Sequence, residues 1–197
     1  CGKTSLMYAL MQHLVQQQKV AQNQILYLNF EDERLALIES ADLELIYQWF
    51  LEYSSAKDKI YFFLDEIQNV PLWEKWLSRS YEKIKFVISG SNATLLSSEL
   101  SSALTGRHVE LEVYPFSFKE YLHFLNIPYN HPKIIYSTEN KAIISKAYTQ
   151  YYLKGGFPEA LLFGKQDLLS QYYRDILLRD VIARYTIRHK GQLEKLS

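Results

Sequence analysis

Helical patterns and short apolar runs alternate along the first half of the chain. Apolar residues recur at helical spacing over 6–15 and again over 42–53. Short runs that are mainly apolar stand at 25–30, 60–64 and 86–88, and the run at 60–64 is uninterrupted. Uninterrupted apolar runs of strand length are typical of strands that are buried on both faces of a parallel sheet. The pattern therefore predicts an α/β fold in which a parallel sheet is flanked by helices.

Further elements are predicted in the middle of the chain. Residues 95–104 are a serine-rich helical stretch, and Gly106 suits the C-terminal cap of that helix. The sequence Val-Glu-Leu-Glu-Val at 109–113 predicts a strand, and residues 118–125 predict a short helix. We assign these elements, together with the alternating first half, to one domain over residues 1–125.

A polar break separates this domain from a helical C-terminal part. Residues 126–140 contain two prolines and three asparagines, a composition typical of a linker. A helix is expected from Lys141 until Gly155 and Gly156, and Pro158 suits the first turn of the next helix. We therefore assign 141–197 to a separate helical segment.

Charge gives little support for a nucleic-acid partner. The chain has 22 basic and 22 acidic residues, so only a local basic patch would attract nucleic acid. A helix predicted from Leu168 carries arginines at positions 174, 179, 184 and 188. They spread around the helix, and Asp175 and Asp180 each stand four residues before an arginine, in the order that favours ion pairs. A solvated, internally paired helix is the better interpretation.

The remaining composition is that of an ordinary globular protein. Of the 197 residues 48% are hydrophobic, and the single cysteine, Cys1, cannot form an internal disulfide. No window approaches the roughly 20 apolar residues of a membrane span, and no signal peptide is visible. We therefore expect a cytoplasmic protein without a membrane partner.

The N-terminal sequence contains half of a phosphate-binding pattern. Gly2, Lys3 and Thr4 open the first predicted helix and match the end of the pattern G-x-x-x-x-G-K-[ST]. In such a site the backbone N–H groups and the helix dipole hold phosphates, the lysine reaches the β- and γ-oxygens, and the threonine hydroxyl binds magnesium. The alternative is a plain helix entry with an incidental lysine and threonine.

Two adjacent carboxylates follow the second apolar run. Asp65 and Glu66 stand where the predicted strand 60–64 ends. In a phosphoryl-transfer site the first carboxylate holds the magnesium shell and the second accepts a proton from the attacking water. The alternative is a strand end with two solvated acids. Because Gly-Lys-Thr precedes the pair by a helix, a strand and a helix, the joint pattern favours a nucleotide site.

The whole chain resembles the AAA-type P-loop ATPases of bacteria and archaea, and more closely the subgroup whose ATPase module is followed by a domain of unknown function. The resemblance rests on Gly2-Lys3-Thr4 and on the segments 61–68, 86–92, 104–107, 114–122 and 155–160. It implies a P-loop sheet, a small helical lid with the start of a following domain over 141–197, and a nucleotide site formed by Gly2, Lys3, Thr4 and Ser5. It also implies that Thr4 and Asp65 hold Mg²⁺, that Glu66 is the catalytic base and that ATP is the nucleotide.

Two further roles are implied by the resemblance. A polar side chain at the end of the third strand orients the water near the γ-phosphate, and Ser89, Ser91 and Asn92 are the candidates for this sensor. Ser91 or Asn92 could equally cap the next helix. Arg107 resembles the arginine finger that reaches the γ-phosphate of a neighbouring subunit, which implies a homo-oligomer. Alternatively, Arg107 balances the C-terminus of the preceding helix.

The resemblance also places a strand before Cys1, between the third strand and the strand after Arg107. We therefore expect the 197 residues to be a piece of a longer protein and to bind ATP poorly by themselves. The leading hypothesis for the whole protein is magnesium-dependent ATP hydrolysis. The alternatives are a nucleotide-gated signalling or interaction module with little turnover, and a nucleic-acid-associated ATPase.

Overall fold

Three parallel strands form the centre of the first of two compact units, which spans Gly2–Val113. The strands β1 (Ile25–Asn29), β2 (Ile60–Asp65) and β3 (Ile84–Ile88) lie in the order β1-β2-β3. Their register pairs Asn29 with Asp65 and Leu64 with Ile88, so the carboxyl ends of all three strands meet at one edge. The predicted α/β fold with a parallel sheet flanked by helices is confirmed.

The computed structural model of the chain describes residues 2–54, 59–90, 106–129, 137–163 and 169–171. The predicted helix at 95–104 lies outside the described residues, as do the sensor candidates Ser91 and Asn92. Most of the helix predicted from Leu168 lies outside them as well.

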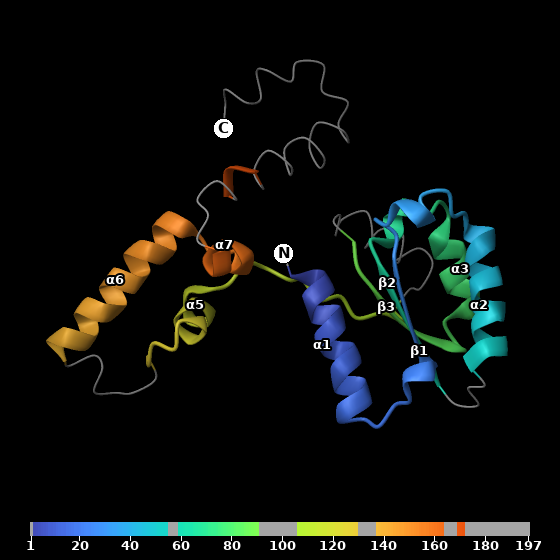
Figure 1. Cartoon of the computed structure of the whole chain (residues 1–197), viewed down its shortest axis with the longest axis horizontal. Coiled ribbons are helices and arrows are strands. Elements are labelled where there is room, and N and C mark those ends of the chain that lie inside the picture. Colours follow the sequence, from blue (N-terminus) through green and yellow to red (C-terminus); the bar gives the residue numbers. More distant parts are fainter. Residues whose placement is uncertain (1, 55–58, 91–105, 130–136, 164–168, 172–197) are drawn as a thin grey trace, which may run out of the picture. The chain divides into compact units, whose positions relative to one another are not determined.

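Helices cover both faces of the sheet. The helix α1 (Lys3–Gln16) lies on one side, and α2 (Ser40–Ser54) and α3 (Trp73–Ser80) lie on the other (Figure 1). Three short 3₁₀ helices connect these elements: η1 (Gln22–Gln24), η2 (Glu33–Leu35) and η3 (Ile67–Asn69). The helices predicted over 6–15 and 42–53 are thus confirmed, each a little longer than its apolar pattern.

The core between the sheet and the helices α2 and α3 is built around aromatic rings. Phe62 of β2 is 1% exposed and meets Phe50 of α2 edge-on, with ring centroids 5.1 Å apart. It also stacks on Trp76 of α3, at 6.4 Å between ring centroids. Edge-on and stacked pairs of this kind add to the free energy gained by burial. The middle strand is thereby fixed, and with it the position of its last residue, Asp65.

The segment 109–113 is not a strand in the structure, which contradicts its prediction. A strand needs a neighbouring strand to pair its backbone groups, and the sheet of the described residues ends at β3. Val109 and Leu111 are 97% and 73% exposed, so their side chains face solvent and gain nothing from burial. Local sequence preference alone was not sufficient to make this segment a strand.

The second compact unit begins at Tyr114 and is helical where it is described. Its helices are α5 (Phe118–Phe124), α6 (Thr138–Lys154) and α7 (Pro158–Phe163). The side chains of Tyr121, Leu122 and Ala147 form its small core. The short helix near 118–125 and the helix that starts at Pro158 are confirmed, and α6 begins three residues earlier than predicted because Ser137 caps it.

The helix α5 packs against α6 in this second unit, whereas the predicted boundary placed residues 118–125 in the first domain. The domain bounds 1–125, 126–140 and 141–197 stay predictions, and so does the role of the helical part as a lid. None of the described helices is both long and apolar enough to cross a lipid bilayer.

Candidate functional site

The start of α1 and the end of β2 are joined by a hydrogen bond. Gly2 precedes α1 with a φ of 71°, a left-handed backbone conformation that glycine adopts without strain. Thr4, in the first turn of α1, donates from Oγ1 to Asp65 Oδ2 over 2.6 Å. The half-pattern Gly-Lys-Thr and the strand-end carboxylate, which the sequence placed far apart, thus form one site.

Asp65 is a fully buried carboxylate that accepts three hydrogen bonds from side chains. Its Oδ2 accepts from Thr4 and, over 3.1 Å, from the hydroxyl of Tyr27. Its Oδ1 accepts from the hydroxyl of Ser89. A carboxylate loses its hydration on burial and needs such donors to stay charged. The alternative of a solvated strand end is therefore wrong for Asp65, which is 0% exposed.

Glu66 turns the chain sharply at the end of β2. Its φ of 54° and ψ of 45° place a non-glycine residue in the left-handed region, which costs on the order of 1 kcal/mol and is common at functional sites. Its carboxylate accepts from Gln68 Nε2 over 2.6 Å and lies 3.5 Å from the Lys3 ammonium. The phosphate-binding candidate Lys3 and the candidate base Glu66 thus form an ion pair in this structure.

Ser89 joins the two acidic residues. Its hydroxyl donates to Asp65 and also accepts from the backbone N–H of Glu66 over 3.3 Å. The backbone N–H of Ser89 donates to the carbonyl of Leu64, which ties the end of β3 to the end of β2. Among the three sensor candidates, Ser89 is the one that the structure describes, and it lies in the site.

Tyr27 and Gln68 also contact the two acids, although neither is a candidate from the sequence. Tyr27 contacts Asp65, and its ring lies 5.1 Å from the ring of Tyr8 on α1. Burial raises the pKa of the Tyr27 hydroxyl, and a hydrogen bond with Tyr8 and the negative charge of Asp65 raise that pKa further. A tyrosine within an otherwise apolar strand was the available signal, since a buried hydroxyl needs a polar partner.

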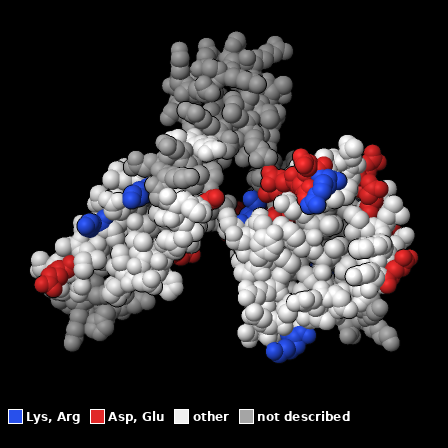
Figure 2. Space-filling view, viewed as in Figure 1, with Lys and Arg blue, Asp and Glu red and all other residues white. Residues whose placement is uncertain are grey.

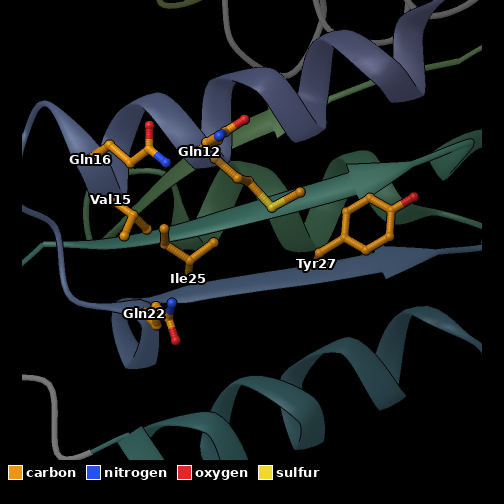
Figure 3. A pocket seen from close by; sticks show the side chains of 7 residues that line it. Gln12, Val15, Gln16, Gln22, Ile25 and Tyr27 are labelled. Carbon is orange, nitrogen blue, oxygen red and sulfur yellow. The ribbon is translucent and has the colours of Figure 1, made fainter.

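A groove of about 360 Å³ runs between α1 and β1 (Figure 3). The ring of Tyr27 stands at one end of it, with Val15 and Ile25 toward the other end. The remaining lining residues are Met11, Gln12, Gln16 and Gln22. One side of the Tyr27 ring therefore borders open space instead of packed side chains.

Two other predicted site residues, Arg107 and Ser5, make none of the contacts to Asp65 and Glu66 described above. Arg107 donates to the hydroxyl of Tyr81, and its guanidinium carbon lies 5.0 Å from the centroid of that ring. Because an arginine finger acts on a neighbouring subunit, this contact leaves the predicted role untested. Ser5 follows Thr4 on α1 and is exposed, as is Gly2.

The sequence model that describes an AAA domain matches residues 1–122. The chain belongs to the AAA domain family. The match covers the whole Gly2–Val113 unit of this AAA domain and therefore every residue of the site described above.

Similar proteins occur in a bacterium and in an archaeon. An uncharacterized protein of Haemophilus influenzae is 36% identical over 193 residues, which is 95% of this chain and 45% of that protein. An uncharacterized protein of Methanocaldococcus jannaschii is 34% identical over 200 residues, or 99% of this chain and 43% of that protein. The AAA domain chain thus spans less than half the length of these relatives.

The oxygen atoms of Thr4 and Asp65 fit a magnesium ion that also binds water and phosphate better than they fit a metal ion bound only by protein side chains. Within the described ranges, no group of three or more His, Cys, Asp or Glu side chains is placed to hold a metal ion. Magnesium, however, is usually bound by one or two carboxylates together with water and substrate phosphates. Since the Thr4 hydroxyl donates its proton to Asp65, its lone pairs stay free to bind a cation.

Proposed function

We propose that this AAA domain is the nucleotide-binding module of a magnesium-dependent ATPase. The observation that carries the proposal is the hydrogen bond between Thr4, at the start of α1, and the buried Asp65 at the end of β2. Ligand sites of parallel α/β sheets lie at the carboxyl ends of the strands, and helix N-termini bind phosphate. The family match supports nucleotide binding, and the specific reaction is our inference.

Each residue at the start of α1 has a role in holding the nucleotide. The backbone N–H groups that follow Gly2 would bind phosphate oxygens, and the Lys3 ammonium would balance the charge of the β- and γ-phosphates. Thr4 would bind Mg²⁺ through its hydroxyl, with Asp65 holding that hydroxyl and the magnesium-bound water. Magnesium, when bound, neutralises the negative charge that develops on the phosphates.

Glu66 is the proposed base that accepts a proton from the attacking water. Its side chain is 15% exposed, so it lies at the surface of the site without being freely solvated. Lys3 lies against Oε1 of Glu66 and would move from there to a phosphate when nucleotide binds. Gln68 holds the other oxygen, Oε2, and so keeps the carboxylate oriented.

The test is ATP turnover and ATP binding by a full-length protein that contains this chain, with Glu66→Gln. We expect E66Q to bind magnesium-ATP with unchanged affinity and to lose at least about a hundredfold in turnover, as for the loss of a general base. Glu52→Gln on an exposed part of α2 is the charge-matched control and should leave turnover unchanged. Equal turnover by wild type and E66Q would contradict the assignment.

A nucleotide-gated module with little turnover is the second candidate, and the Lys3–Glu66 ion pair favours it. Because Lys3 would move to the phosphates, occupancy would remove the cation beside Glu66 even when no hydrolysis follows. Binding with negligible turnover by the wild type, together with nucleotide-dependent oligomerisation, would support this candidate. A nucleic-acid-associated ATPase has less support, because the chain has as many acidic as basic residues, and on the face in Figure 2 the described Lys and Arg side chains form no continuous patch within either unit.

A further inference from the structure

The oxygen of Asp65 that contacts Thr4 is held from a second direction. Thr4 of α1 and Tyr27 of β1 both donate to Oδ2 of Asp65, over 2.6 Å and 3.1 Å. The two donors come from different elements, and Asp65 belongs to a third one, β2. One carboxylate oxygen thus connects a helix and two strands.

Sheet register explains why Tyr27 reaches this oxygen. Asn29 is the register partner of Asp65 in the parallel pair of β1 and β2, and Tyr27 stands two residues before Asn29. Residues two apart on a strand point to the same face of the sheet, and register partners share that face. Tyr27 and Asp65 are therefore diagonal neighbours, and a tyrosine is long enough to span the diagonal.

Tyr8 holds Tyr27 from the helix side. It stands four residues after Thr4, so both side chains project from the same face of α1. Its ring centroid lies 5.1 Å from that of Tyr27, and burial together with the interaction between the two hydroxyls raises the pKa of Tyr27. The helix α1 therefore contacts Asp65 directly through Thr4 and indirectly through Tyr8 and Tyr27.

We propose that Tyr27 is a positioning residue for magnesium binding: its hydroxyl fixes Oδ2 of Asp65, and this oxygen in turn orients the hydroxyl of Thr4. A threonine hydroxyl rotates freely unless its proton has a fixed acceptor. With Oδ2 fixed, the Thr4 proton points at Asp65, and the oxygen lone pairs point away from it, where they would be available to a cation. The inference rests on the proposed magnesium-nucleotide function.

Tyr27→Phe isolates the hydroxyl from the packing of the ring. Phenylalanine keeps the ring, which borders the groove between α1 and β1, and lacks only the hydroxyl. The variant therefore loses a hydrogen-bond donor and keeps the packing of the ring. Tyr61→Phe is the matched control, because Tyr61 lies on the same face of β2 but four residues before Asp65, roughly 13 Å along the strand. Tyr8→Phe removes the outer hydroxyl and leaves the contact between Tyr27 and Asp65.

The experiment measures binding of a fluorescent ATP analogue to the full-length protein, titrated with Mg²⁺ and repeated in EDTA. We expect Y27F to raise the half-saturating Mg²⁺ concentration about tenfold, the usual size of a lost outer contact at a metal site. Its affinity in EDTA should stay within about twofold of wild type, because the phosphate contacts of α1 are intact. Y61F should match wild type in both titrations, and Y8F should show a smaller rise than Y27F.

Four results would overturn the inference or its basis. A Y27F protein with the same half-saturating Mg²⁺ concentration as wild type would contradict the positioning role. An equal loss of nucleotide affinity with and without Mg²⁺ would indicate a general structural role instead. If Y27F does not fold, the Y8F variant provides the test. A rise of about threefold in its half-saturating Mg²⁺ concentration supports the inference, and no change contradicts it. A wild-type protein that binds no magnesium-nucleotide would overturn the proposed function itself.

Discussion

Thr4 and Asp65 stand 61 positions apart in the sequence, and the hydroxyl of Thr4 donates to Oδ2 of Asp65 over 2.6 Å. This contact brings the start of α1 to the carboxyl end of the middle strand, where Ser89 reaches the other oxygen of Asp65. A helix N-terminus for phosphate and a buried carboxylate for the magnesium shell are thus placed together.

Ser89→Ala should impair both stability and turnover. The hydroxyl of Ser89 serves Asp65 and the backbone of Glu66 at once, and removing a partner of a buried charged group costs about 1–3 kcal/mol. We expect a loss of this size in the free energy of unfolding, with a clear fall in ATP turnover. Ser80→Ala on α3 is a control of similar burial, 5% against 8% exposed, and should leave turnover intact.

Arg107→Ala separates the arginine finger from a purely local contact with Tyr81. If Arg107 serves a neighbouring subunit, its loss should lower turnover about a thousandfold and spare ATP affinity. If it only covers Tyr81, turnover stays unchanged. Tyr81→Phe removes the hydrogen bond to Arg107 and keeps the ring, so a turnover loss in R107A but not in Y81F would support the finger. Steady-state kinetics and equilibrium binding give the two readouts.

The strands and the paired acids could be predicted because their signal is local. The sequence itself shows the apolar run at 60–64 followed by Asp65 and Glu66. It also shows Gly-Lys-Thr directly before a helical pattern. The prediction of a strand at 109–113 was wrong because a strand also requires a neighbouring strand to pair with. A local sequence pattern carries no information about that neighbour.

The contact between Tyr27 and Asp65 could not be predicted from the sequence. The hydroxyl of Tyr27 reaches Asp65 only because the register sets Asn29 beside Asp65, and register is a property of the paired strands. Gln68 likewise reaches Glu66 because the chain turns into the left-handed region at Glu66. The acids, Thr4 and Ser89 are recognisable as candidates in the sequence, whereas the contacts of Tyr27 and Gln68 with the acids depend on tertiary geometry.

Leu64→Ala and Leu37→Ala test the core with the same chemical change. Leu64 lies in β2 and is 1% exposed, whereas Leu37 is 94% exposed. Truncation of a buried leucine leaves a cavity and costs about 2–5 kcal/mol, whereas an exposed substitution stays within about 0.5 kcal/mol. Denaturant unfolding of the two variants measures the difference. Similar losses for both would show that Leu64 is not in a packed core.

Glu120→Gln tests the pH dependence of the second unit. Hydrogen bonds from the side chain and the backbone of Ser117, at the start of α5, lower the pKa of Glu120. Since the folded state favours the charged form, the stabilisation is present at neutral pH and is lost as the pH falls through the lowered pKa. Wild type should therefore melt above E120Q at pH 7. The two melting temperatures should converge well below pH 4, and a difference that persists there would contradict this origin.

The most direct test of the nucleotide site is magnesium-dependent ATP binding by full-length protein with Thr4→Ser and with Thr4→Val. Serine keeps the hydroxyl that donates to Asp65, and valine keeps the shape without it. We expect T4S to bind like wild type, and T4V to lose at least about tenfold in affinity with Mg²⁺ but less than about twofold in EDTA. Wild-type affinity of T4V in the presence of Mg²⁺ would contradict the site.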